Sequence, residues 1–177
     1  MPGSRTHDAV TLLLTAPAAA AAYAAGLDIG GSALVAASFL FGGLMFGPDL
    51  DILSKQHSRW GVLGFLWYPY RSFFKHRSRW SHGLLFGTLI RVIYFMGAAT
   101  LLSFAAAYLI AAYNGSDLPR LSELALTWSA LGESVRSKTS TYFLPAIFAG
   151  LWSGAASHTL TDMAGSYVKT GRVTEFL

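Results

Sequence analysis

The stretch GLWSGAASHTLTDMAG, residues 150–165, joins two kinds of sequence in one segment. Its first half is apolar and rich in small residues, which is typical of helices that pack closely inside a membrane. His158 and Asp162 are four positions apart, so on a helix they share one face. Gly150 and Gly154 continue the same row and predict that another helix approaches closely there. The pair is either a polar helix end facing water or half of a metal site.

The composition favours a membrane protein. The chain has 177 residues, of which 53% are hydrophobic and 12% charged, and its mean hydropathy is +0.44. These values are more apolar than is usual for a soluble domain. The chain has no cysteine, so a metal ion would have to be bound by His, Asp or Glu. We expect no nucleic-acid partner.

Four segments approach the roughly 20 apolar residues that a membrane-spanning helix needs. They cover residues 10–26, 29–47, 83–113 and 141–162. We therefore predict an all-α fold, a single transmembrane domain over residues 1–177 with four transmembrane helices. An aromatic loop at 60–74 (WGVLGFLWYPYRSFF) is expected at the lipid–water interface. A surface amphipathic helix is expected within 114–140, with Leu121, Leu124, Ala125, Trp128 and Leu131 on one face. The alternative for the first segment is a cleaved signal peptide, which would remove His7.

Basic residues are distributed unevenly between the two sides that four crossings would create. One side carries Arg5, Lys55, Arg59, Arg71, Lys75, Arg77, Arg79, Lys169 and Arg172, and the other carries Arg120, Arg136 and Lys138. The positive-inside rule then predicts that both termini are cytoplasmic. Arg91 falls inside the third span, where it either snorkels to the interface or binds an anion.

Most of the histidines lie where the predicted spans begin or end. His7 precedes span one, Asp49 and Asp51 follow span two, His76 and His82 precede span three, and His158 and Asp162 end span four. Alternating crossings place all of these positions at the same membrane face. We therefore predict one shared metal site, with Asp162 a few ångströms from Asp49 or Asp51. His57 and Asp8 are interpreted as loop and tail residues.

Local sequence predicts how two of these pieces are built. Pro48 ends span two directly before the turn that carries Asp49 and Asp51. Ser81 is a good N-cap residue, so we expect a helix to begin near His82 and to leave His76 in the preceding loop.

The ligand types favour a divalent transition metal, zinc or manganese first, over calcium, which prefers oxygen ligands. Seven ligands are too many for one tetrahedral ion. One or two ions are expected, and two ions with bridging or divided carboxylates fit the count better. The neighbouring cations Arg71, Lys75, Arg77 and Arg79 would attract phosphate, or they are only part of the positive-inside signal.

In combination, these motifs resemble a known family. THD at 6–8, FGGLMF followed by PDLD at 48–51, SHG at 81–83 and the final His158 and Asp162 are similar to an uncharacterised metal-binding integral membrane family common in cyanobacteria. That family is related to the inner-membrane-associated metal-dependent hydrolases (YdjM-like), which more often have Thr-His-Ser where this chain has Ser81-His82-Gly83. The resemblance implies a metal-binding protein of a bacterial inner or thylakoid membrane.

Two functions remain open at this point. The first is hydrolysis of a phosphoester or lipid-linked substrate by metal-activated water, with Arg77 or Arg79 stabilising the developing charge. The second is a structural metal site in a subunit or assembly factor of a larger membrane complex. A transporter is disfavoured because no ligand lies at mid-membrane. A phosphatase with a histidine nucleophile is disfavoured because its upstream lysine and Arg-Pro block are missing.

Overall fold

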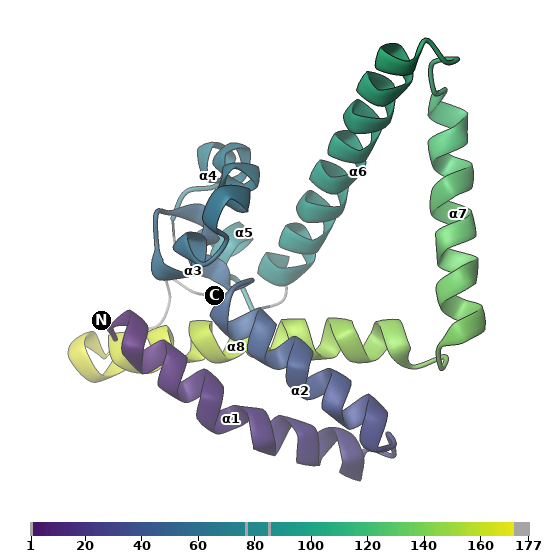
Figure 1. Ribbon diagram of the computed structural model, residues 1–177. Helices are drawn as coiled ribbons and strands as arrows, with labels where there is room; N and C mark the ends of the chain where they lie inside the picture. The colour runs from purple at the N-terminus through teal and green to yellow at the C-terminus, as the bar shows by residue number, and fades with distance from the viewer. Residues whose placement is uncertain (1, 77, 85, 172–177) are drawn as a thin grey trace. The chain divides into compact units, whose positions relative to one another are not determined.

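A computed structural model of the chain describes residues 2–76, 78–84 and 86–171, and in this part every regular element is helical (Figure 1). The longer helices are α1 (Ser4–Ala24), α2 (Ile29–Leu44), α6 (Phe86–Asn114), α7 (Leu121–Lys138) and α8 (Phe143–Thr170). The connection from α2 to α6 contains the short elements η1 (Pro48–Asp51), α3 (Lys55–Ser58), η2 (Gly61–Trp67), α4 (Tyr68–Phe73) and α5 (Arg79–His82). The prediction of an all-α fold is confirmed.

Each of the four predicted spans coincides with a long helix, namely α1, α2, α6 or α8. Of the helices in the described ranges, only α6 is long and apolar enough to cross a membrane by length and composition, and α2 is apolar but shorter. The helices are therefore where the sequence predicts them, while the four-span arrangement stays a prediction.

The chain forms two compact units. The first contains residues up to Val92 and from Tyr142 onward, and the second contains Ile93–Thr141. In the second unit, α7 confirms the helix expected within 114–140. The carboxylate of Glu123 accepts a hydrogen bond from the backbone N–H of Arg120 and so caps the start of α7. None of the residues of α7 is buried.

Glycines hold α2 and α8 together at backbone distance. A Cβ atom on Gly150 would lie 2.6 Å from the carbonyl oxygen of Val35, and one on Gly154 would collide with the carbonyl oxygen of Phe39. In the opposite direction, a Cβ on Gly42 would lie 2.5 Å from the carbonyl oxygen of Leu151. The close approach predicted from the small-residue row is therefore confirmed, and the neighbouring helix is α2.

The segment predicted as an aromatic loop is helical and contributes two aromatic side chains to the core. Residues 60–74 form η2 and α4, in which Trp67 and Tyr70 are fully buried. The ring centroid of Trp67 lies 5.5 Å from that of Phe46, and 5.6 Å from that of Tyr70. The prediction of a loop is wrong, because packing of these aromatic rings on one another orders the segment as short helices. Its position at a lipid–water interface stays a prediction. Val62 and Phe73 remain exposed.

Two helices extend beyond the apolar runs from which their spans were predicted. Helix α1 begins at Ser4, so His7 is the fourth residue of the helix and does not precede it. Helix α8 continues to Thr170 and ends at Gly171, whose φ of 68° is the left-handed conformation common after a helix. His158 and Asp162 are thus interior residues of α8, and the prediction that they end the helix is wrong.

We expect Gly154→Ala to destabilise the protein, because the added methyl group forces the backbones of α2 and α8 apart. Overpacking of this kind costs about 1–3 kcal/mol. The matched control is Gly132→Ala in α7, where an added Cβ meets nothing within 4 Å, and where alanine should be neutral or slightly stabilising. Thermal unfolding of both purified variants measures the difference. Equal stability would contradict the close packing.

Candidate metal centre

The predicted ligands gather in two adjacent groups. The η1 group consists of Asp49, Asp51, His76 and His82, and the α8 group consists of His7, His158 and Asp162. Within each group every residue offers a ligand atom within 4.8 Å of the others. All seven residues singled out from the sequence therefore belong to one of the two groups.

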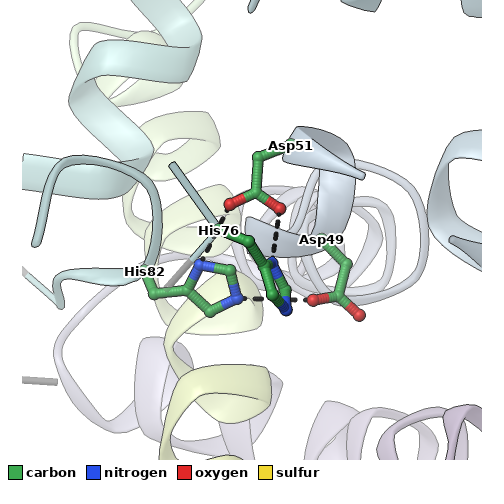
Figure 2. Close-up of side chains that lie close together, drawn as sticks. All are labelled: Asp49, Asp51, His76 and His82. Carbon is green, nitrogen blue, oxygen red and sulfur yellow. Dashed lines mark hydrogen bonds and ion pairs between the residues drawn. The ribbon is translucent and has the colours of Figure 1, made fainter. Parts of the chain in front are cut away.

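The η1 group is built around His82 (Figure 2). Its Nε2 lies 3.3 Å from Oδ1 of Asp49, and its Nδ1 lies 3.4 Å from Oδ2 of Asp51. The other carboxylate oxygen of Asp51 lies 2.9 Å from Nδ1 of His76. Pro48 begins η1, and this single tight turn presents both carboxylates toward His82. His82 is almost fully buried, while His76 is partly exposed.

The α8 group joins α8 to the start of α1. Nε2 of His158 lies 3.6 Å from Oδ2 of Asp162, one turn further along the same helix. Nε2 of His7 lies 3.2 Å from Oδ1 of Asp162. The imidazole rings of His7 and His158 stack in parallel, with centroids 3.7 Å apart. All three residues are buried, so the pair on α8 does not face water.

Asp49 connects the two groups. Its Oδ1 faces His82, and its Oδ2 lies 3.4 Å from Nε2 of His158. Asp49 and Asp162 therefore approach the same nitrogen, within 3.6 Å. A direct approach of Asp162 to Asp49 or Asp51 stays a prediction. A carboxylate with one oxygen directed into each group has the position that a bridging ligand takes between two ions.

The spacing of the donor atoms fits a shared cation. A charge-assisted N–H···O hydrogen bond is usually about 2.7–2.9 Å long. Apart from the His76–Asp51 contact, the His-to-Asp separations in the two groups are 3.2–3.6 Å. Ligands about 2.0–2.1 Å from a tetrahedral ion are about 3.3–3.4 Å from one another. These separations are longer than strong hydrogen bonds and match the spacing of ligands around an ion, to which His82 can offer only one of its two nitrogens.

Several buried atoms of the groups make no hydrogen bond. They are Oδ2 of Asp51, Nδ1 of His7 and Nε2 of His158. A buried polar atom without a partner costs about 1–3 kcal/mol, so such atoms are rare in folded proteins. Two of the three, Oδ2 of Asp51 and Nε2 of His158, are atoms that a metal ion in these groups would contact.

The electrostatics of the groups favour positive charge. Burial raises the pKa of Asp49, but the neighbouring imidazoles of His158 and His82 outweigh it and hold that pKa well below its usual range. The pKa of Asp51 is lowered in the same way by His82 and His76, again against burial. Burial lowers the pKa of His82, but the two carboxylates outweigh it and raise that pKa. The carboxylates therefore stay ionised and attract a cation.

Buried hydrogen bonds hold the short segment that carries His82. Arg91 is buried, and it donates from Nη1 to the carbonyl oxygen of Ser81 (2.6 Å) and from Nη2 to Oγ1 of Thr88 (3.0 Å). Its guanidinium is therefore bound within the protein, and the snorkelling interpretation is wrong.

The prediction that Ser81 is an N-cap is wrong. Ser81 lies inside α5, its backbone N–H donates to Oγ of Ser78, and α6 begins only at Phe86.

Gln56 was not identified from the sequence and holds His158 in place. Its Oε1 accepts from the backbone N–H of Asp49 (3.1 Å), and its Nε2 donates to the carbonyl oxygen of Gly43 (2.7 Å). These two contacts leave only one orientation for the amide, so its second N–H points at Nδ1 of His158, 3.2 Å away. The neutral ring of His158 then carries its hydrogen on Nε2, and an ion bound there would displace that proton.

Two further residues were placed in a tail and a loop by the sequence interpretation, and both are ordered. Oδ2 of Asp8 accepts from Nζ of Lys55 (2.8 Å) and from Nη2 of Arg59 (2.6 Å). His57 is buried and stacks on Tyr68. Its nearest ring contact lies on α4, and it belongs to neither ligand group.

Of the four cations predicted to attract phosphate, the structure describes the side chains of two, Arg71 and Lys75. Arg77 lies outside the described residues, and Arg79 begins α5 with only its backbone described. Arg71 lies over the ring of Tyr68, 5.6 Å from its centroid, and Lys75 is exposed. The described cleft beside His7, Asp49 and His158 is bordered by Lys55 and Arg59 instead.

A helical protein in which imidazoles and carboxylates lie this close together is typical of metal-binding proteins. The chain belongs to the family of uncharacterized metal-binding proteins (DUF2227), whose profile matches residues 2–172. It is also 40% identical over 57 residues to an uncharacterized protein from Aquifex aeolicus (strain VF5). That match covers 32% of this chain and 40% of the relative, so the chain matches less than half of the relative's length. No solved structure matches the chain.

We expect Gln56→Leu to lower the free energy of unfolding and to weaken metal binding. The variant leaves the buried carbonyl of Gly43, the N–H of Asp49 and Nδ1 of His158 without their partner, and each loss costs about 1–3 kcal/mol. Ser72→Ala is the control, because the hydroxyl of Ser72 bonds only an exposed carbonyl. Thermal unfolding with and without added zinc measures both effects. A variant as stable as the control would contradict the role of Gln56.

Proposed function

We propose that this chain is a membrane protein with a dinuclear metal centre in which Asp49 bridges two ions. The single observation that carries the proposal is the position of Asp49, with one oxygen 3.3 Å from His82 and the other 3.4 Å from His158. One ion would be held by the η1 group and one by the α8 group. Membership of a metal-binding family supports the same conclusion.

Zinc or manganese is the metal that we propose. Four imidazoles and three carboxylates form a mixed nitrogen and oxygen donor set, which suits these ions and disfavours calcium. Buried donors from α1, η1, α5 and α8 surround the site. The unpartnered Oδ2 of Asp51 and Nε2 of His158 support the presence of a cation there.

The reaction that we propose is hydrolysis of a phosphoester on a soluble or lipid-linked substrate. A pair of bound ions supplies an activated water and polarises the phosphoryl group. The protein orients the two ligand groups, excludes bulk water through burial of His7, His82 and His158, and presents cations beside the centre. The likeness of its motifs to the YdjM-like hydrolases supports this reaction. Arg77 and Arg79 keep their proposed part in stabilising the transition state.

A structural metal centre is the alternative function. It is favoured because the elements that carry the ligands lie far apart in the sequence. Ions at this place would hold the start of α1, the α2–α6 connection and α8 together. Such a protein would act as a subunit or assembly factor of a larger membrane complex. The two functions differ in turnover and in the stability of the metal-free protein.

A membrane location is also proposed, with both termini in the cytoplasm. The membrane would account for the apolar outer faces of the helices. Leu13 on α1, Ile29 on α2 and Leu144 on α8 are exposed, and none of the most apolar 18-residue window of α6 is buried. These faces would contact lipid, in a bacterial inner or thylakoid membrane. The excess of basic residues in the α2–α6 connection supports a cytoplasmic metal centre.

We expect two metal ions per chain in the detergent-purified protein. His7→Ala should retain about one ion, because it damages only the α8 group, whereas Asp49→Asn should lose both through loss of the bridge. His57→Gln is the matched control, since this buried histidine lies outside both groups. Elemental analysis of folded protein measures the stoichiometry. Folded wild-type protein without metal would overturn the proposal.

The same preparations separate catalysis from structure. A catalytic centre predicts hydrolysis of a generic phosphoester by wild-type protein, with loss of at least about a hundredfold in the folded Asp49→Asn variant. A structural centre predicts no turnover and a large fall in thermal stability when a chelator removes the metal. Measuring rate and unfolding temperature on the same samples distinguishes the two.

The absence of cysteine from the chain makes its topology directly testable. We expect Ser72→Cys to be protected from a membrane-impermeant maleimide in intact bacterial cells and Ser116→Cys to be labelled. Ser72 lies in the α2–α6 connection, and Ser116 follows α6, so four crossings place them on opposite sides. Both should react after the cells are lysed. Labelling of both residues in intact cells would rule out the proposed orientation.

A further inference from the structure

The α8 group has a described opening to the surface. A small cleft of about 20 Å³ is bounded by His7, Asp49 and His158 and, on the outer side, by Lys55, Arg59 and Asp8. Such a volume holds little more than one water molecule. Through this cleft, a molecule that approaches the α8 group passes between two cationic side chains and one carboxylate.

One carboxylate oxygen of Asp8 accepts hydrogen bonds from both Lys55 and Arg59. Its Oδ2 accepts from Nζ of Lys55 at 2.8 Å and from Nη2 of Arg59 at 2.6 Å. The pair of cations carries two positive charges against the single negative charge of Asp8. The side chains of Lys55 and Arg59 are 47% and 26% exposed, so an incoming anion can reach both.

The cations differ in how firmly they are held. Nη1 of Arg59 donates to the backbone carbonyl of Leu44 at 2.7 Å, which fixes one side of the guanidinium and leaves Nη2 directed at Asp8. Lys55 begins α3, and its ammonium reaches Asp8 as a flexible point charge. A fixed guanidinium beside a mobile ammonium is a common arrangement for binding phosphate oxygens.

We propose that Lys55 and Arg59 bind the phosphoryl group of the substrate and that Asp8 occupies this site in its absence. The inference rests on the proposed function, since it names the residues that recognise the substrate at the same centre. Oδ2 of Asp8 stands where a phosphate oxygen would accept from both cations. A phosphate monoester carries about −1.5 to −2 charges near pH 7 and matches the two cations better than one carboxylate does.

This arrangement makes Asp8 a competitor of the substrate, and it predicts opposite effects for neighbouring substitutions. Loss of either cation removes a charge-assisted contact to the phosphate. Loss of the Asp8 charge frees both cations and removes repulsion of the anion. If the three residues only brace α1 against α3, every one of these substitutions weakens the region in the same direction.

The test is calorimetric titration of inorganic phosphate into detergent-purified, metal-loaded protein. Lys55→Gln and Arg59→Gln should weaken binding about tenfold or more, the effect of losing one charge-assisted hydrogen bond. Asp8→Asn should tighten binding severalfold. Lys169→Gln, which removes an exposed cation that does not line the cleft, should leave it unchanged. Because Arg59 also bonds Leu44, the exposed Lys55 provides the variant that keeps the fold intact, and Lys55→Arg should restore binding.

Parallel titrations with glycerol 3-phosphate and a short-chain phosphatidic acid in micelles identify the source of the phosphoryl group. Tighter binding of the lipid assigns a phospholipid headgroup, and equal binding assigns a soluble ester. Weaker binding in Asp8→Asn, no binding by the wild type, or equal losses in Lys169→Gln would each overturn the proposal. Metal content is measured on the same samples, so a wild type without metal refutes the metal centre while the phosphate titration still tests the cations.

Discussion

The close contact between the backbones of α2 and α8 is the constraint on which the ligand groups depend. Gly150, Gly154, His158 and Asp162 follow one another at four-residue intervals, so the row that allows close packing leads directly into the row that carries ligands. Because α2 lies against this row, η1 directly after it brings Asp49 within 3.4 Å of His158. A larger side chain in the row would separate the helices and the ligands together.

Burial of so many ionisable groups is tolerable only because they balance one another. The carboxylates of Asp49 and Asp51 raise the pKa of His82, and the imidazoles lower the pKa values of the carboxylates in return. An isolated buried charge would be far more costly. Gln56 adds a neutral link, which ties Asp49, Gly43 and His158 without adding charge. The ligands in the interior are thus already oriented for an incoming cation.

Helix positions and the grouping of the candidate ligands were predictable, because apolar runs mark the long helices and the candidate ligands lie beside or at the ends of these runs. The boundaries of α1 and α8 were not, since bilayer thickness limits an apolar run and not a helix. Burial of Trp67 also escaped prediction, because interfacial and core aromatics have the same composition. Gln56 and Asp8 gave no signal in the sequence, because a lone amide and a lone acid near a terminus become informative only when their partners are known.

The bond between Gln56 and His158 joins residues 102 positions apart, and the α8 group joins the first helix to the last. During synthesis, His7 and Asp49 emerge from the ribosome long before α8 exists. The nascent chain therefore has no complete α8 group to offer a metal ion until α8 has been synthesised. A chain truncated before α8 would lack His158 and Asp162 and could not complete this ligand group.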